Sequence, residues 1–412
     1  RYWRDWSSDV CSSDLLDIGT AKVTCMVAEV KPDGRLNVIG LGTQPTSGLK
    51  RGVVVIEATV DAISRVVQEV EVMADCKIHE VYTGIAGSHI KSFNSSGTVA
   101  IKEKEVSPMD VDRVIEVARA MPIPAEQQIL HILTQEFIID GQGGVREPIG
   151  MSGVRLEVKV HIVTGAVSAA QNVIKCVRRC GLEVMDLSLQ PLASSHAVLT
   201  EDEKELGVCM VDIGGGTTDI AVFTQGAIRH TAVIPVAGDQ ITNDIAMALR
   251  TPTSEAEEIK MRHGVAMHQL ADAEEMIEVP GVGDRPPRKL SRQALADVIE
   301  PRVSELFELV QAELRRSGYE ELLSSGIVLT GGSAVMRGMV ELAEEVFHMP
   351  ARVGSPQYDG GLADVVCQPR YSTAMGLVME GAAQRRRGLQ ARDTRSVKQF
   401  FGRMKSWFER NF

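Results

Sequence analysis

The densest group of chemically useful residues in this sequence is a glycine-rich turn that follows an apolar run at 206–210. The turn contains Asp212, Gly214, Gly215, Gly216, Thr217, Thr218 and Asp219. Three successive glycines remove every Cβ, so backbone N–H groups can close on a phosphate, and the threonines add hydroxyl donors. The two carboxylates bring the negative charge that a magnesium ion and its waters require. Because a glycine triplet after a strand is more often an ordinary hairpin turn, this turn alone does not establish a phosphate site.

The same order of residues occurs a second time near the beginning of the chain. Residues 15–22 read Leu-Leu-Asp-Ile-Gly-Thr-Ala-Lys, which is again an apolar strand, an Asp-Ile-Gly turn and a hydroxyl. In both copies a second apolar run follows, then turn residues, and then a third run. These runs occupy 23–30 and 36–41 in the first copy, and 220–223 and 228–236 in the second. Two hairpins of one duplicated plan could face each other and hold a polyphosphate between them.

A third glycine turn, at 327–334, also follows an apolar strand and opens a helix. Its N–H groups and the helix dipole suit a phosphate or the edge of a nucleoside. The three turns in this order resemble the actin-like ATPase superfamily, which includes actin, Hsp70 chaperones and sugar kinases. The resemblance implies an α/β, actin-like (ribonuclease H-like) two-lobed ATPase fold, with ATP and Mg²⁺ bound between the lobes.

Composition limits the class of protein. A chain of 412 residues exceeds one hydrophobic core, so two or more domains are expected. The formal net charge of −11 argues against nucleic acid as the main partner. The seven cysteines are scattered and odd in number, which favours reduced thiols. Cys176 and Cys180 lie four apart on an expected helix, but no CxxC pattern or neighbouring histidine supports a metal site there.

Periodicity and turn residues divide the chain, and the four core parts take the superfamily's names 1A, 1C, 2A and 2B. We expect a foreign or disordered leader at 1–14, subdomain 1A at 15–87 and 166–197, an inserted subdomain 1C at 88–165, subdomain 2A at 198–236 and 301–383, subdomain 2B at 237–300, a basic linker at 384–395 and an amphipathic helix at 396–412. The leader is dense in aromatics and has no apolar h-region, and it leaves the first strand little more than Leu15 and Leu16 before its turn.

The last residues follow a helical pattern typical of a membrane-surface helix. One stripe holds Val397, Phe400, Phe401, Met404, Trp407 and Phe408. Basic residues lie outside the stripe, as an interfacial helix requires. At 1.5 Å per residue a helix over 396–412 reaches only about 25 Å, so it cannot span a bilayer. The alternative is a terminal helix docked on its own core, but such a helix does not need an arginine-rich segment before it. A single tail should bind the membrane weakly, whereas many tails on one polymer should together bind it firmly.

The actin-like body, the insertion and the tail together resemble the FtsA family of bacterial cell-division proteins. Besides the two phosphate turns and the tail, the resemblance rests on Ser-Gly-Leu-Lys-Arg-Gly at 47–52 and Pro-Ile-Gly-Met-Ser-Gly at 148–153. It implies a peripheral protein on the cytoplasmic face of the inner membrane at the septum, which polymerises and anchors FtsZ filaments. The implied partners are the FtsZ C-terminal peptide at 2B, other copies of this chain, later divisome membrane proteins at 1C and an anionic lipid membrane. Arg285, Arg288 and Lys289 are candidates to contact the acidic FtsZ peptide.

The resemblance also assigns site residues. The nucleotide-binding set is Asp17, Gly19, Thr20, Lys22, Asp212, Gly214, Gly215, Gly216, Thr217, Thr218, Gly238, Glu257, Lys260, Gly331, Gly332 and Ser333. Asp17 and Asp212 are expected to hold Mg²⁺ through water, with Asp212 and Gln190 near the hydrolytic water. Hsp70 chaperones carry Glu before Pro where this chain has Gln190-Pro191, and an amide cannot accept a proton. We therefore expect tight ATP binding and slow hydrolysis.

The sequence leaves two other functions open. The same ATP clamp could serve a kinase for a small metabolite, although no further polar pocket motif appears and such a kinase has no use for the tail. A pilus-assembly actin homologue is the other alternative. An Hsp70 chaperone is excluded because no substrate-binding domain follows the ATPase.

Overall fold

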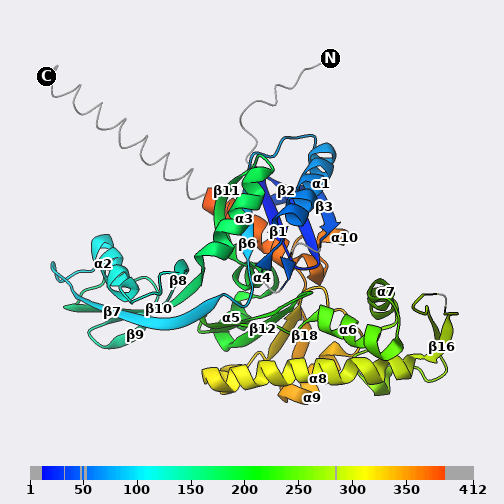
Figure 1. Cartoon of the computed structure of the whole chain (residues 1–412). Helices are drawn as coiled ribbons and strands as arrows, with labels where there is room; N and C mark the ends of the chain where they lie inside the picture. Colours follow the sequence, from blue (N-terminus) through cyan, green and yellow to red (C-terminus); the bar gives the residue numbers. More distant parts are fainter. Residues whose placement is uncertain (1–11, 32, 47–48, 51–52, 284, 386–412) are drawn as a thin grey trace.

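The computed structural model describes residues 12–31, 33–46, 49–50, 53–283 and 285–385. Figure 1 shows two sheet-based lobes, one above the other, with 1C extending to one side and 2B to the other. The tail residues that form the expected membrane stripe lie outside the described residues. Within the part of the chain that is described, no helix combines the length and apolar character needed to cross a bilayer.

The upper lobe, 1A, is a five-stranded sheet in the order β11-β6-β1-β2-β3. Its strands are β1 (Ser12–Ile18), β2 (Lys22–Val30), β3 (Leu36–Pro45), β6 (Glu80–Ile85) and β11 (Glu183–Leu189). A two-stranded ribbon of β4 (Leu49–Lys50) and β5 (Val53–Val54) precedes the first helix. Helices α1 (Ile56–Ala74) and α3 (Val167–Arg179) bury their apolar stripes on one face of this sheet. The helix expected around Cys176 and Cys180 is α3.

β1 begins earlier than the sequence suggests. Ser12, inside the expected leader, already pairs with Glu29 of β2, and Asp14 is buried. The expectation of a first strand limited to Leu15 and Leu16 is therefore wrong. Pairing with β2 extends β1 through backbone hydrogen bonds, which do not depend on apolar side chains.

The lower lobe, 2A, repeats the plan in a sheet of order β14-β13-β12-β17-β18. Its strands are β12 (Val208–Ile213), β13 (Thr218–Thr224), β14 (Ala227–Ile234), β17 (Ile327–Thr330) and β18 (Ala351–Val353). In both lobes the first strand runs antiparallel to the second and parallel to a strand on its other side, β6 or β17. The duplicated hairpin expected from the sequence is thereby confirmed, and its two turns lie at the matching ends of β1 and β12.

Seven further helices, six in or beside the lower lobe and α10 beside β3 of the upper lobe, are described (Figure 1). They are α4 (Gln190–Val198), α5 (Glu201–Leu206), α6 (Gly238–Leu249), α7 (Thr253–His263), α8 (Arg292–Ser317), α9 (Met339–Phe347) and α10 (Ala363–Val366). In 2B, α6 and α7 adjoin the hairpin β15 (Met276–Val279) and β16 (Arg288–Ser291). The last described helix covers 372–385. Its Glu380 accepts a hydrogen bond from Ser188 of β11, and its Gln384 donates one to Asp186 of the same strand. This helix therefore lies along 1A.

Subdomain 1C is a four-stranded sheet of order β7-β10-β8-β9. Its elements are β7 (Lys91–Ala100), α2 (Pro108–Arg119), β8 (Gln127–Ile139), β9 (Gln142–Val145) and β10 (Arg155–Ala166). The helix starts with a capping box, in which Ser107 and Asp110 bond each other's backbone N–H.

Subdomain 1C docks on β14, the outer strand of 2A, through hydrogen bonds of polar side chains. We call this contact the β14 seam; it joins residues 228–231 of β14 to Ser92, Asn94, Gln135 and His161 of 1C. Nε2 of His161 lies 3.0 Å from Oγ1 of Thr231, and Nδ1 lies 2.8 Å from Oδ1 of Asn94. Burial, reinforced by His230, lowers the pKa of His161 to about 4, so the imidazole is neutral at neutral pH. The orientation of 1C relative to 2A therefore depends on specific hydrogen bonds.

Candidate functional site

The two duplicated turns face each other between the lobes. Each is closed by one backbone hydrogen bond: Gly19 N–H donates to Lys22 O at 2.9 Å, and Gly214 N–H donates to Thr217 O at 3.0 Å. A Cβ on Gly216 would lie 2.8 Å from Cγ2 of Thr20, and a Cβ on Gly215 would lie 3.0 Å from Cβ of Ala21. The absence of side chains at these glycines is what allows the two turns to touch.

The third turn joins the first two. Gly331 has φ +90°, and a Cβ there would lie 2.4 Å from Oδ1 of Asp212, so only glycine fits. Ser333 Oγ donates to Gly214 O at 3.2 Å, and Gly238 N–H donates to the same carbonyl at 3.1 Å. The expected phosphate and adenosine turns are thus brought into direct contact by the fold.

Two residues of α7 reach the same place from 2B. Lys260 is buried, and its Nζ contacts Gly238 O at 3.1 Å, Thr242 Oγ1 at 2.7 Å and the Glu257 carboxylate at 2.6 Å. Glu257 also accepts a short hydrogen bond from Thr242. The ion pair couples α7 to the start of α6, next to the Gly214 turn.

Four aspartates in and beside the cleft have raised pKa values. Burial raises the pKa of Asp17 to about 6, with Lys22 opposing the shift and Asp212 adding to it. Burial and the neighbouring Asp212 raise the pKa of Asp219 to about 7. Burial also raises the pKa of Asp212 and of Asp239. These carboxylates lack an opposing charge equal to their own, so a divalent cation would relieve an electrostatic cost that the folded protein otherwise bears.

Hydrogen bonds fix the orientation of the carboxylates. Ser194 Oγ donates to Oδ2 of Asp212 at 2.7 Å, and Thr373 Oγ1 donates to the same oxygen at 3.4 Å. Gln190 Nε2 donates to Oδ1 of Asp17 at 2.9 Å. Asp219 accepts from Thr217 on Oδ2 at 3.1 Å, while its buried Oδ1 has no hydrogen-bond partner among the described residues.

Lys22 is engaged on the far rim of the cleft. Its Nζ donates to Arg370 O at 2.8 Å and lies 4.2 Å above the centre of the Tyr371 ring. Burial is the main cause that lowers the pKa of Lys22 to about 8. An anionic ligand between the turns would compete with a carbonyl and an aromatic face for this ammonium group.

The donor set fits magnesium held through water and phosphate. Within the described ranges, no group of three or more His, Cys, Asp or Glu side chains is arranged to hold a metal ion by itself. Asp17 and Asp212 are close enough to influence each other's charge, and they lie beside turns whose N–H groups suit phosphate oxygens. Mg²⁺ characteristically keeps several waters and takes one or two carboxylates together with phosphates.

The structure therefore gathers the expected nucleotide residues, with one difference in detail. Thr218 is fully buried and its hydroxyl donates to Val236 O at 2.8 Å, so its side chain braces the end of β14. The sequence analysis missed Ser194, Thr373, Arg370 and Tyr371. No local motif marks them, because Ser194 lies on α4, Thr373 on the helix over 372–385, and Arg370 and Tyr371 on the short turn at Pro369–Tyr371 before it, and only the packing of these segments brings them to the cleft.

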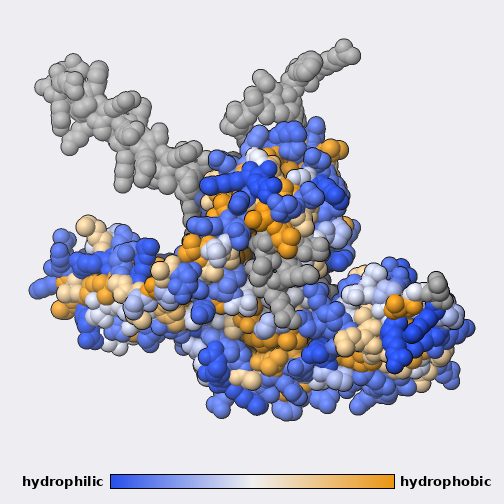
Figure 2. All heavy atoms as spheres, in the orientation of Figure 1, coloured by the Kyte–Doolittle hydropathy of each residue, from blue (hydrophilic) through white to orange (hydrophobic). Residues whose placement is uncertain are grey.

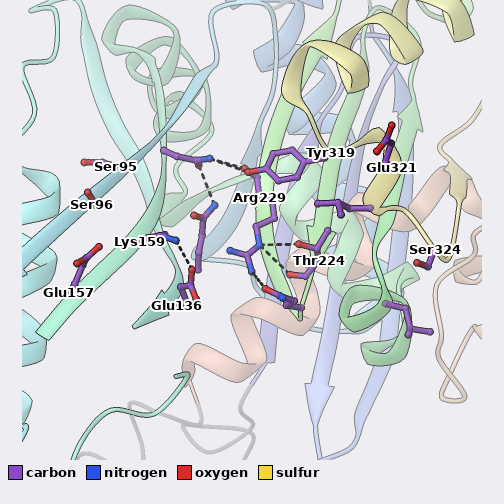
Figure 3. Close-up of a pocket in the computed structure, with 15 residues that line it drawn as sticks. Ser95, Ser96, Glu136, Glu157, Lys159, Thr224, Arg229, Tyr319, Glu321 and Ser324 are labelled. Carbon is purple, nitrogen blue, oxygen red and sulfur yellow. Dashed lines mark hydrogen bonds and ion pairs between the residues drawn. The ribbon is translucent and has the colours of Figure 1, made fainter. Parts of the chain in front are cut away.

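A separate cavity of about 700 Å³ lies between 1C and 2A (Figure 3). Its polar walls include the Lys159–Glu136 ion pair and Arg229, which is held by Thr224 and Gln225. None of the expected nucleotide residues lines it.

Comparison with known proteins decides the family. A Pseudomonas aeruginosa protein described as "Cell division protein FtsA" is 64% identical over 375 residues, covering 91% of this chain and 90% of that protein. The chain belongs to the FtsA family. A Neisseria meningitidis FtsA is 52% identical over 405 residues, covering 97% of this chain and 98% of the relative. The family model for cell division protein FtsA matches residues 209–376, and the model for the SHS2 domain inserted in FtsA matches residues 87–164.

Solved structures confirm the actin-like fold expected from the three turns. A PilM–PilN type IV pilus biogenesis complex aligns with TM-score 0.66 at 18% identity, covering 90% of this chain and 98% of that chain. MreB5 of Spiroplasma citri bound to ADP aligns with TM-score 0.52 at 16% identity, covering 93% and 98%. The MamK double helical filament aligns with TM-score 0.51 at 12% identity, covering 89% and 98%. At these identities the likeness concerns the fold alone.

Proposed function

We propose that this FtsA-family chain binds ATP with Mg²⁺ between the two duplicated turns. The observation that carries the proposal is the contact of these turns at Gly215 and Gly216, beside buried carboxylates with raised pKa values. Phosphates would accept from backbone N–H groups of both turns, and Lys22 would leave Arg370 O for a phosphate oxygen. Gly331, Gly332 and Ser333 would border the adenosine, and Glu257 and Lys260 its ribose and base.

The bound nucleotide acts as a conformational ligand in this proposal, because position 190 supplies no general base. Gln190 stands beside Asp17 and its amide donates a hydrogen bond, so it cannot take a proton from water. Slow hydrolysis is expected, with ATP holding both lobes in the form that polymerises. A phosphate-release assay tests this point, and turnover of many per second would contradict it.

Polymers of the chain would anchor FtsZ filaments to the cytoplasmic face of the inner membrane at the septum. Family membership and the amphipathic pattern at 396–412 support this proposal. Each tail contributes a weak contact and the polymer sums the contacts by avidity. Sedimentation with anionic vesicles, with and without residues 396–412, tests it, since the truncated chain should stay in the supernatant.

The proposed contacts with protein partners lie at opposite sides of the molecule. On 2B, Arg285 and Lys289 are exposed and available to an acidic FtsZ peptide, whereas Arg288 also bonds Leu249 O. On 1C, the exposed apolar side chains of Met109, Ile149 and Val154 support a site for later divisome membrane proteins. The metabolite-kinase and pilus-assembly alternatives have no specific observation in their favour once family membership is established.

A further inference from the structure

Helix α3 presents a basic face at the surface of 1A. Gln171, Lys175 and Arg178 are exposed and follow helical spacing, so they lie on one face, and Arg179 is exposed beside them. The opposite face, with Val173 and Val177, is buried against the sheet. The helix contains no acidic residue.

This face is a recessed surface with positive charge along it. Among the described residues, a groove of about 520 Å³ is lined by Gln171, Ile174, Lys175, Arg178 and Arg179. Figure 2 shows strongly hydrophilic side chains over the upper lobe in the region of α3. Arg179 is engaged by Glu57 at 3.0 Å, whereas no ion pair within the described part of the chain involves Lys175 or Arg178. Two cations of the face are therefore available to an external anion.

The described part of the chain ends close to the C-terminal end of α3. Arg385, its last residue, has its guanidinium 3.8 Å from the Glu80 carboxylate at the start of β6. Glu80 pairs in the sheet with Glu183, the first residue of β11, and only residues 180–182 separate β11 from the end of α3. The last described residue therefore lies near the C-terminal end of α3.

We infer that the basic face of α3 contacts anionic lipid headgroups directly, as a second membrane contact of the protein body. The inference rests on the proposed membrane function of the tail. A tail that reaches a bilayer from this point brings the α3 face toward the same bilayer, and the two free cations match its negative charge. Glu57, Glu80 and Glu183 flank the face and limit the area that can approach, which leaves Lys175 and Arg178 as the contacting pair.

A second membrane contact would fix the orientation of the protein body relative to the membrane. A tail alone would tether the body without fixing which side faces the lipid, whereas a second contact on 1A turns the α3 face toward the membrane. Copies aligned in a polymer would then all present the same side. A role for the basic residues limited to the dipole at the C-terminal end of α3 would predict an effect on stability and none on lipid binding.

The test is sedimentation of the full chain with phosphatidylcholine vesicles that contain increasing fractions of phosphatidylglycerol. The variant Lys175→Gln/Arg178→Gln is compared with Lys102→Gln/Arg119→Gln, which removes the same two charges from exposed positions on 1C. At about 1 kcal/mol per basic residue near an anionic surface, the α3 variant should bind roughly 30-fold more weakly to the anionic vesicles. On vesicles of low anionic content the two variants should converge, and the 1C variant should match the parent throughout.

The outcomes separate this inference from the proposed function. If the parent binds but the α3 variant binds equally well, the α3 contact is wrong and the tail proposal stands. If the parent does not bind vesicles at all, both are wrong. The charge-preserving variant Lys175→Arg/Arg178→Lys should restore parental binding, and failure to do so would assign the loss to misfolding of 1A and overturn the lipid contact.

Discussion

At the scale of single residues, the cleft is organised by carboxylates that burial makes reluctant to ionise. Asp17 and Asp219 titrate at about 6 and about 7, so part of the population carries protons on them near neutral pH. A magnesium ion favours the ionised forms, and protons therefore compete with it. Oδ1 of Asp219, which has no hydrogen-bond partner within the described part of the chain, would gain one from a cation or its water.

The first prediction concerns pH. Since protons and Mg²⁺ compete, the affinity for MgATP should fall as pH is lowered from 8 to 6, by roughly tenfold through Asp219 and only about twofold through Asp17, because their pKa values are about 7 and about 6. Calorimetric titration in buffers of different ionisation enthalpy should also detect protons released on binding at pH 6.5. In Asp219→Asn, the part of the pH dependence centred near 7 should disappear, and its persistence would contradict the role given to Asp219.

Gln190 gives a second prediction. Gln190→Glu places a carboxylate where the amide now donates to Asp17, and a carboxylate can accept a proton from the attacking water. Phosphate release at pH 8, where the new group is ionised, should rise by at least about tenfold. Gln190→Ala serves as the control and should not accelerate hydrolysis. Equal rates for the parent and Gln190→Glu would show that the missing base is not what slows turnover.

At the scale of elements, the strands and helices follow closely from the pattern of apolar residues. The strands of the duplicated hairpins lie within a few residues of their expected places. The start of β1 was missed because backbone pairing with β2 extends it through Ser12. The β14 seam was also missed, since His161 and Asn94 become partners of β14 only through the docking of two subdomains.

A third prediction concerns the approach of the two turns. Gly216→Ala should weaken ATP binding by at least roughly tenfold, because its Cβ would lie 2.8 Å from Cγ2 of Thr20 and would push the turns apart. Gly143→Ala on 1C, away from the cleft, is the control, since the nearest atom to a Cβ there is the flexible carboxylate of Glu136 at 3.2 Å. Fluorescent-nucleotide titration of both variants measures the effect, and equal affinities would mean that turn contact is not required.

The seam gives a fourth prediction. His161→Ala should lower the free energy of unfolding by about 1–3 kcal/mol at pH 7, because it removes the hydrogen-bond partner of the Thr231 hydroxyl and one of the two partners of Asn94 Oδ1. His268→Ala, at an exposed histidine of 2B, should stay within about 0.5 kcal/mol of the parent. Denaturant unfolding measures both, and hydrogen exchange should rise along β14 in the first variant only.

The sign of the pH effect at the seam follows from the lowered pKa of His161. The folded protein holds this group neutral down to a pKa of about 4, while the unfolded chain protonates it near the ordinary histidine pKa of 6.5. The stabilisation is therefore present above pH 6.5 and is lost as pH falls toward 4. The difference between the parent and His161→Ala should shrink over that window, and a difference that grows there would contradict the assignment.

At the scale of the whole molecule, we propose that nucleotide binding in the cleft between the two lobes and membrane binding by the tail work together. The three turns and the family could be recognised from sequence, because each motif is local and their order is specific. The packing of the last helix along β11, which fixes where the tail departs, could not, since it depends on contacts of Glu380 and Gln384 with a distant strand. A chain with a net charge of −11 needs a concentrated basic region to approach an anionic membrane.

The measurement that tests this claim most directly is sedimentation of the full chain with anionic vesicles, with and without MgATP, followed by electron microscopy. We predict that MgATP increases vesicle binding cooperatively and produces filaments on the vesicle surface, because polymerised tails act together. Gly216→Ala should lose the increase and retain only weak binding. Binding that is equally strong with and without nucleotide, or that survives deletion of residues 396–412, would contradict the account.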